Sequence, residues 1–290
     1  MVYQITSLLA AVSFSTLTGY VWAGNVLSGT SISSMYYDCC KPACAWNTAG
    51  PSYLATNLQV CDANDNIITD DPLSAASYCD GGPATACTTQ QPWAVNDTFA
   101  YGFASVFIAG DQPADWCCSC YELEFLNSTI KGKKMIVQSI NVNYNENQEN
   151  YFSLTVPGQA DWADKCAQRF GGDFGTFLGK NSTGGVANIT QCNTVPESLQ
   201  PGCEWRYGWY ENVQLPSVAF QRVQCPTELV QKTGCTRLDE HNFAPASSNT
   251  LGNVSDSSDT KTNSAPSSRS GLSPLVHAAA ILFTGAFLFI

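Results

Sequence analysis

The sequence predicts a mainly β domain, a barrel whose long loops are tied together by disulfide bridges. The first indication is a series of short β-rich runs that are broken by Gly, Pro and Asn. The second is that all fourteen cysteines lie between Cys39 and Cys235, an even number typical of a disulfide framework in an exported chain. The third is length, because residues 24–245 are enough for one domain with a sizeable core.

The N-terminal residues 1–23 are predicted to be a secretory signal peptide that does not belong to the fold. Residues 5–22 are largely apolar, and small or β-branched residues precede the expected cleavage near Ala23. The usual basic residues before the apolar stretch are missing. The alternative is an N-terminal membrane helix, which is disfavoured because the stretch holds several Ser and Thr residues and no basic flank orients it. We expect the chain to be secreted.

Four runs within the domain predict strands, and one segment predicts a short helix. Pro226–Gly234 is the helical segment, because a proline suits the first turn of a helix and a glycine its end. The predicted strands are Phe99–Phe107, Cys120–Phe125, Lys134–Val142 and Val218–Cys225.

The C-terminal part is predicted to be a stalk followed by an anchor signal. Residues 246–274 are rich in Ser, Thr, Asn, Asp and Gly, which indicates a disordered or O-glycosylated stalk. Residues 275–290 form an apolar run of 16 residues, shorter than a bilayer span. Small residues at Asn263–Ala265 or Ser270–Gly271 complete a GPI attachment signal, and a tail-anchored helix is the alternative. We expect a membrane link only through this anchor, at the outer face of the plasma membrane or at the cell wall.

Composition and motifs exclude several kinds of chemistry. A net charge of −11 with only 13 Lys and Arg residues argues against a nucleic-acid partner. The sequence has two histidines, His241 and His277, and no phosphate-binding glycine loop, so we expect no metal and no cofactor. Carboxylate acid/base chemistry remains, and it suits the hydrolysis of acetals. Passage through a secretory pathway fits five glycosylation sequons, at Asn96, Asn127, Asn181, Asn188 and Asn253.

The most informative segment is Ser33–Trp46. It sets one carboxylate, Asp38, between two tyrosines and a pair of adjacent cysteines that cannot easily bond each other. Aromatic faces stack on the apolar faces of pyranose rings, so we predict that Tyr36 and Trp46 line a sugar-binding groove. The alternative is that the aromatic residues are core, as we expect of most tryptophans.

The run Asp38–Trp46 resembles the active-site signature of glycoside hydrolase family 45, the fungal endoglucanases. The resemblance implies a six-stranded double-psi β-barrel with an open groove, and hydrolysis of internal β-1,4-glucosidic bonds with inversion. Asp38 matches the general base. The implied disulfides are Cys39–Cys166, Cys40–Cys79, Cys44–Cys117, Cys61–Cys87, Cys118–Cys235, Cys120–Cys225 and Cys192–Cys203. The resemblance continues through Gln91–Asp97, Trp116–Leu123, Lys133–Ser139, Pro201–Arg206 and Val223–Leu229.

The sequence departs from the family pattern at the general acid. That position holds Ser153, whose hydroxyl cannot deliver a proton at a useful pKa. Glu146 matches a further family carboxylate and is a candidate displaced acid or auxiliary carboxylate, and Glu149 is a second candidate acid. Both glutamates could instead be solvated loop charges.

Three functions therefore stay open. The first is a monomeric endoglucanase acting on cellulose or a related β-glucan. The second is a non-hydrolytic protein that binds β-glucan or loosens the wall, as the similar-barrelled expansins do. The third is a wall-anchored scaffold.

Overall fold

The computed structural model describes residues 27–247, except 144–147, 160–165, 167 and 171–184. The predicted signal peptide, nearly all of the predicted stalk and the hydrophobic tail lie outside the described residues, so they remain predictions. Within the described residues, none of the helices has both the length and the hydropathy that crossing a bilayer requires.

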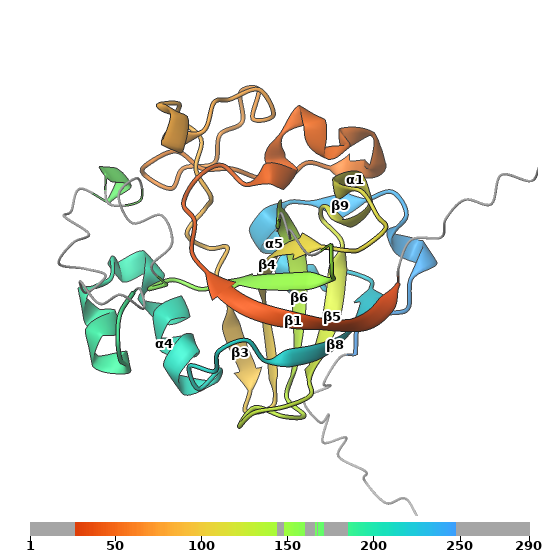
Figure 1. The fold of residues 1–290 in the computed structure, drawn as a ribbon. Coiled ribbons are helices and arrows are strands. Elements are labelled where there is room, and N and C mark those ends of the chain that lie inside the picture. The colour runs from red at the N-terminus through yellow and green to blue at the C-terminus, as the bar shows by residue number, and fades with distance from the viewer. Residues whose placement is uncertain (1–26, 144–147, 160–165, 167, 171–184, 248–290) are drawn as a thin grey trace, which may run out of the picture. The chain divides into compact units, whose positions relative to one another are not determined.

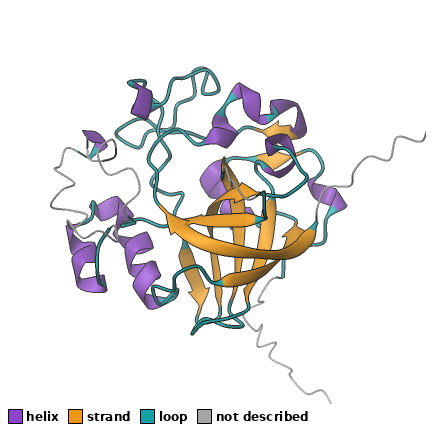
Figure 2. Cartoon of the chain, viewed as in Figure 1, coloured by secondary structure: helices purple, strands orange, loops and turns teal. Residues whose placement is uncertain are grey.

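Six strands close into a barrel, as predicted (Figures 1 and 2). They follow one another in the order β4-β6-β5-β8-β1-β7, and β7 pairs back with β4 to complete the ring. β1 runs parallel to β7, and β4 runs parallel to β6. The barrel strands are β1 (Ser28–Tyr36), β4 (Phe99–Phe107), β5 (Cys120–Phe125), β6 (Lys134–Val142), β7 (Tyr151–Thr155) and β8 (Ser217–Val223).

The remaining strands lie outside the ring. β3 (Trp93–Asn96) pairs with β4 as a hairpin, and β2 (Leu54–Thr56) pairs with β9 (Thr236–Arg237) in a separate two-stranded sheet. Three α-helices are described, namely α1 (Pro113–Trp116), α4 (Gln200–Gly208) and α5 (Thr227–Thr233). The 3-10 helices are η1 (Ala43–Ala45), η2 (Asn47–Ala49), η3 (Pro51–Tyr53), η4 (Tyr78–Asp80), η5 (Ile189–Thr194), η6 (Glu197–Leu199) and η7 (Glu240–Asn242).

The sequence located three of the barrel strands at their observed bounds, and the predicted strand Val218–Cys225 corresponds to β8. The helix α5 is confirmed: Pro226 precedes it, and Gly234 ends it in the left-handed region at φ 65°. The prediction did not include β1, β7 or α4. β1 was not predicted because its inward positions include Ser31 and Ser33, so its sequence does not alternate between apolar and polar residues.

Aromatic side chains fill much of the barrel core. Trp116 is buried, as expected of most tryptophans, whereas Trp93 is only partly buried and its ring centroid lies 5.3 Å from that of Tyr101. Trp205 on α4 stacks on Trp209 with ring centroids 5.3 Å apart. Trp209 also packs edge-on against Phe125 of β5, with ring centroids 6.1 Å apart. This contact stabilises α4 against the barrel, since a nine-residue helix gains little from propensity alone.

All seven disulfides implied by the resemblance are present, with no free cysteine among the described residues. The adjacent Cys39 and Cys40 bond to two different partners, Cys166 and Cys79. The residues around Asp38 are thereby fixed from two sides.

The last described residues are clamped against β5 and β8. Arg222 and Arg237 both contact Asp239, at 3.2 and 2.9 Å. The Arg222 guanidinium lies 3.7 Å from the ring centroid of Phe243, and Glu122 on β5 accepts the backbone N–H of Ser247 at 3.2 Å.

Candidate active site

The outer face of β1, β7 and β4 carries a row of small polar residues. In the strand register Ser153 is level with Ser34 on one side and with Ser105 on the other, and Ser105 is level with Asn141 on β6. Leu154, the residue after Ser153 on β7, points into the core. Because successive side chains of a strand point to opposite faces, the row faces outward. We call Ser34, Ser153, Ser105 and Asn141 the serine row.

Hydrogen bonds hold the serine row together. The hydroxyls of Ser34 and Ser153 are 2.8 Å apart. Tyr36, two residues further along β1, accepts hydrogen bonds on its phenol oxygen from Thr155 at 3.2 Å and from the Asn141 amide at 3.4 Å. Burial raises the pKa of Tyr36 to about 12, so its phenol stays neutral at ordinary pH.

Asp38 lies two residues beyond the end of β1 and is partly buried. The backbone N–H of Cys40 donates to its Oδ1 at 2.8 Å. Burial raises the pKa of Asp38 above its ordinary value, and the hydrogen bond from Cys40 opposes this shift. No ion pair of Asp38 occurs within the described part of the chain. A carboxylate in such a place is a better proton acceptor than an exposed one.

The raised pKa of Asp38 makes its charge a cost to stability. The folded state binds the Asp38 proton more tightly than the unfolded state does, so protonation of Asp38 stabilises the fold. This stabilisation is fully present below the ordinary aspartate pKa of 3.8 and is lost as the pH rises through the pKa of the folded state. We expect Asp38→Asn, which keeps the acceptor for Cys40, to be more stable than the wild type at pH 7. Thermal unfolding measured from pH 3 to 7 should show this advantage shrink and vanish as the pH falls. A constant difference would contradict the raised pKa.

Of the other two predicted carboxylates, one lies far from Asp38 and the other is outside the described residues. Glu146 lies outside the described residues. Glu149 is exposed at the start of β7, where it lines a cavity of about 600 Å³ with Thr30 and Tyr151. The parallel register puts Asp38 eight residue steps beyond the level of Glu149, roughly 26 Å for an extended chain. Inversion requires about 6.5–9.5 Å between the two carboxyl groups, so this arrangement does not bring Asp38 and Glu149 together.

The two predicted groove aromatics differ in their surroundings. Tyr36 is part of the polar network around the serine row. Trp46 follows η1 and is partly buried, and the ammonium of Lys41 lies 3.9 Å from its ring centroid. The sequence did not single out Lys41, Ser105, Asn141 or Thr155 as site residues. Ser105 could have been found, because strand alternation in the predicted run Phe99–Phe107 puts it opposite to Ala104 and Val106.

The described residues offer no thiolate or histidine cluster for a metal. Two groups of cysteine and aspartate come close enough together, Asp38 with Cys40 and Cys79, and Asp65 with Cys61 and Cys87. All four sulfurs are in disulfides, so they are not available as thiolate ligands.

Comparison with known proteins gives a consistent set of relatives. The family model described as glycosyl hydrolase family 45 matches residues 29–236. A putative endoglucanase type K of Fusarium oxysporum is 42% identical over 223 residues, which is 76% of this chain and 57% of that protein. An endoglucanase of Cryptopygus antarcticus is 38% identical over 215 residues, covering 74% of this chain and 92% of its own length. The chain thus spans little more than half of the Fusarium relative.

A solved structure shows the same fold. The crystal structure of the cellulase from the Antarctic springtail Cryptopygus antarcticus superposes with a TM-score of 0.63 at 36% sequence identity. The match covers 73% of this chain and 98% of the springtail chain. The similarity is therefore not restricted to fungal proteins.

Proposed function

The chain belongs to glycosyl hydrolase family 45, and from this premise we propose that it hydrolyses internal β-1,4-glucosidic bonds of cellulose or a related β-glucan with inversion. The observation that carries the proposal is Asp38, a partly buried carboxylate with a raised pKa, which lies just beyond the end of β1 and directly before two cysteines that form separate disulfides. Its role would be to take a proton from the water that attacks the anomeric carbon.

The test is the release of reducing ends from soluble β-glucan, with the anomer of the first product followed by NMR. We expect the α-anomer to appear first, because a single displacement inverts the β-linkage. Initial appearance of the β-anomer would exclude this mechanism, and the absence of any product would exclude hydrolysis.

The proton for the leaving oxygen has to come from a group other than Ser153. We propose Glu146 as the displaced acid, on the match of its position to a family carboxylate, with Glu149 as the second candidate. Glu146→Gln should lower the turnover number and remove the basic limb of the pH–rate profile, because that limb reports the protonated acid. An unchanged profile would point to Glu149 or to no acid. Glu149→Gln is the comparison variant: the register relative to Asp38 predicts a smaller effect than in Glu146→Gln, and a larger effect would make Glu149 the acid.

A second candidate function, non-hydrolytic binding of β-glucan, is favoured by one observation. The position of the family acid holds the Ser153 hydroxyl, which is already hydrogen-bonded to Ser34. Hydroxyl groups such as those of the serine row can bind sugar hydroxyls without reacting. Pull-down on insoluble glucan tests it, with the double variant Tyr36→Ala/Trp46→Ala as the control. Lack of retention of the wild-type chain, or equal retention of the double variant, would remove this candidate.

We further propose that the protein is a secreted, GPI-anchored monomer with N-glycans. This proposal rests on the apolar residues 5–22, the apolar run 275–290 and the sequons. Attachment to a surface would favour a polymer of the neighbouring wall as the substrate.

A further inference from the structure

Lys41 is buried, although lysine normally faces solvent. It is 5% exposed, and its ammonium donates hydrogen bonds to the backbone carbonyls of Pro72 at 2.8 Å, Leu73 at 2.9 Å and Ala75 at 2.8 Å. An ammonium has three donors, so these carbonyls use all of them. The nitrogen is therefore fixed in space by the loop that carries Pro72 to Ala75.

The same ammonium lies 3.9 Å from the ring centroid of Trp46, well within the range of a cation–π interaction. A cation above a ring occupies one of its two faces. Trp46 is partly exposed, so a ligand that stacks on this indole has to use the opposite face.

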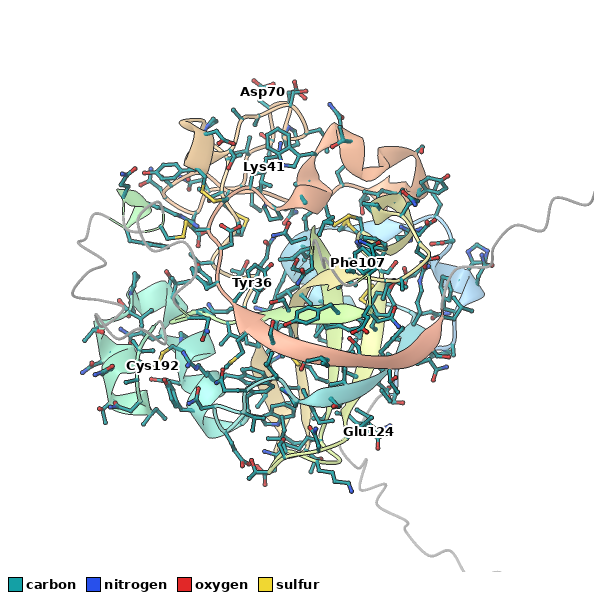
Figure 3. The ribbon with its side chains drawn as sticks, in the orientation of Figure 1. Tyr36, Lys41, Asp70, Phe107, Glu124 and Cys192 are labelled. Carbon is teal, nitrogen blue, oxygen red and sulfur yellow. A yellow bond between two sulfur atoms is a disulfide. The ribbon has the colours of Figure 1, made fainter. Side chains whose placement is uncertain are left out.

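Further contacts join the segment around Lys41 to the same loop. Cys40 bonds to Cys79, and the Lys41 backbone N–H donates to the Ser77 hydroxyl at 3.2 Å. Figure 3 labels Lys41 between Tyr36 and Asp70, where this loop meets the residues that follow β1. The fixed ammonium and the indole therefore belong to the same short segment as Asp38, and these contacts hold that segment against the loop.

We propose that Lys41 is a positioning residue for glucan binding, which holds the Trp46 indole in one orientation and leaves a single ring face open to a pyranose ring. This inference rests on the proposed function. An indole that is oriented before binding does not have to be ordered by the ligand, and such ordering weakens affinity by roughly 2- to 10-fold for one side chain.

The positioning role can be tested without a ligand. In Lys41→Met, which keeps the hydrocarbon stem, the oxidation of Trp46 by N-bromosuccinimide should become several-fold faster when followed by peptide mass spectrometry. Lys41→Arg, which keeps a cation, should restore most of the protection. The matched control is Lys133→Met, because Lys133 also donates to a backbone carbonyl, that of Trp209, and lies 5.1 Å from the ring centroid of Trp209. Unchanged oxidation of Trp46 in Lys41→Met overturns the proposal.

The link to binding is tested by a double-mutant cycle in a calorimeter with thio-linked cellohexaose, whose sulfur linkages resist the proposed hydrolysis. We expect Lys41→Met to weaken binding 2- to 10-fold in the wild-type background and to have no effect in a Trp46→Ala background. An equal loss in both backgrounds overturns the proposal, because Lys41 would then act independently of the indole. If the wild-type chain does not bind thio-linked cellohexaose, the proposed function fails, whereas the oxidation result still decides whether Lys41 orients Trp46.

Discussion

In a Glu146→Gln chain, which lacks the proposed acid, replacing Ser153 by aspartate is expected to raise the turnover number on β-glucan by about 10²- to 10⁴-fold, the usual contribution of a positioned general acid. The new carboxyl group would lie on β7 beside the Ser34 hydroxyl, which is 2.8 Å from the present Ser153 hydroxyl. Ser153 is buried, and burial raises the pKa of a carboxyl group. The introduced acid would therefore keep its proton to a higher pH than an exposed aspartate.

Initial rates between pH 4 and 9 provide the measurement. In the Glu146→Gln chain, Ser153→Asp should restore a basic limb to the profile, because activity is lost where the new acid ionises. The matched control is Ser105→Asp, which puts a carboxyl group at an equally buried position of the serine row, one strand further on, about 4.8 Å away. It carries a similar burial cost but should bring no gain. A folded Glu146→Gln/Ser153→Asp protein with the rates of Glu146→Gln would show that the site lacks another part of the machinery.

Removing the carboxylate of Asp38 is expected to have an effect of similar size in the opposite direction. With 2,4-dinitrophenyl β-cellotrioside the leaving group departs without a proton, so the rate depends on the base and not on any acid. Asp38→Ala should lower this rate by about 10²- to 10⁴-fold, because the attacking water loses its proton acceptor. Azide, a nucleophile that requires no base, should restore turnover and give the α-glycosyl azide.

Two comparisons separate loss of the base from loss of structure. Asp38→Asn retains an acceptor for the Cys40 N–H, so it should lose the same activity while the near-ultraviolet circular dichroism stays that of the wild type. Equal rates of the wild type and Asp38→Ala on the activated substrate would mean that Asp38 is not the base.

The sequence predicted some parts of this architecture well for physical reasons. β4, β5 and β6 are rich in aromatic and β-branched residues, so their β-propensity and bounds are visible locally. The cysteine pairing, in contrast, cannot be derived from one sequence. It followed from the family resemblance, and all seven bridges are confirmed.

The parts that could not be predicted depend on pairing between distant segments. β1 has Gly and Ser at many positions and is stable as a strand because β7 and β8 bond to both of its edges. The serine row joins residues that are up to 119 positions apart, so only the register reveals it. From the sequence alone Lys41 is expected at the surface, because lysine is normally exposed. Only the structure shows that three carbonyls of another loop surround its ammonium.

The clamp around Asp239 has a practical consequence for attaching this domain to a support. Within the ring, two strands separate β5 from β7 in either direction, so the backbone at Ser247 lies against the strand opposite β7, which carries Ser153. A biotin or a bead joined after Ser247 would attach the barrel to a support on its β5 side. An immobilised chain of this kind would leave the β7 side of the barrel, with Ser153, facing a polymer in solution, which makes it suitable for surface-based binding measurements.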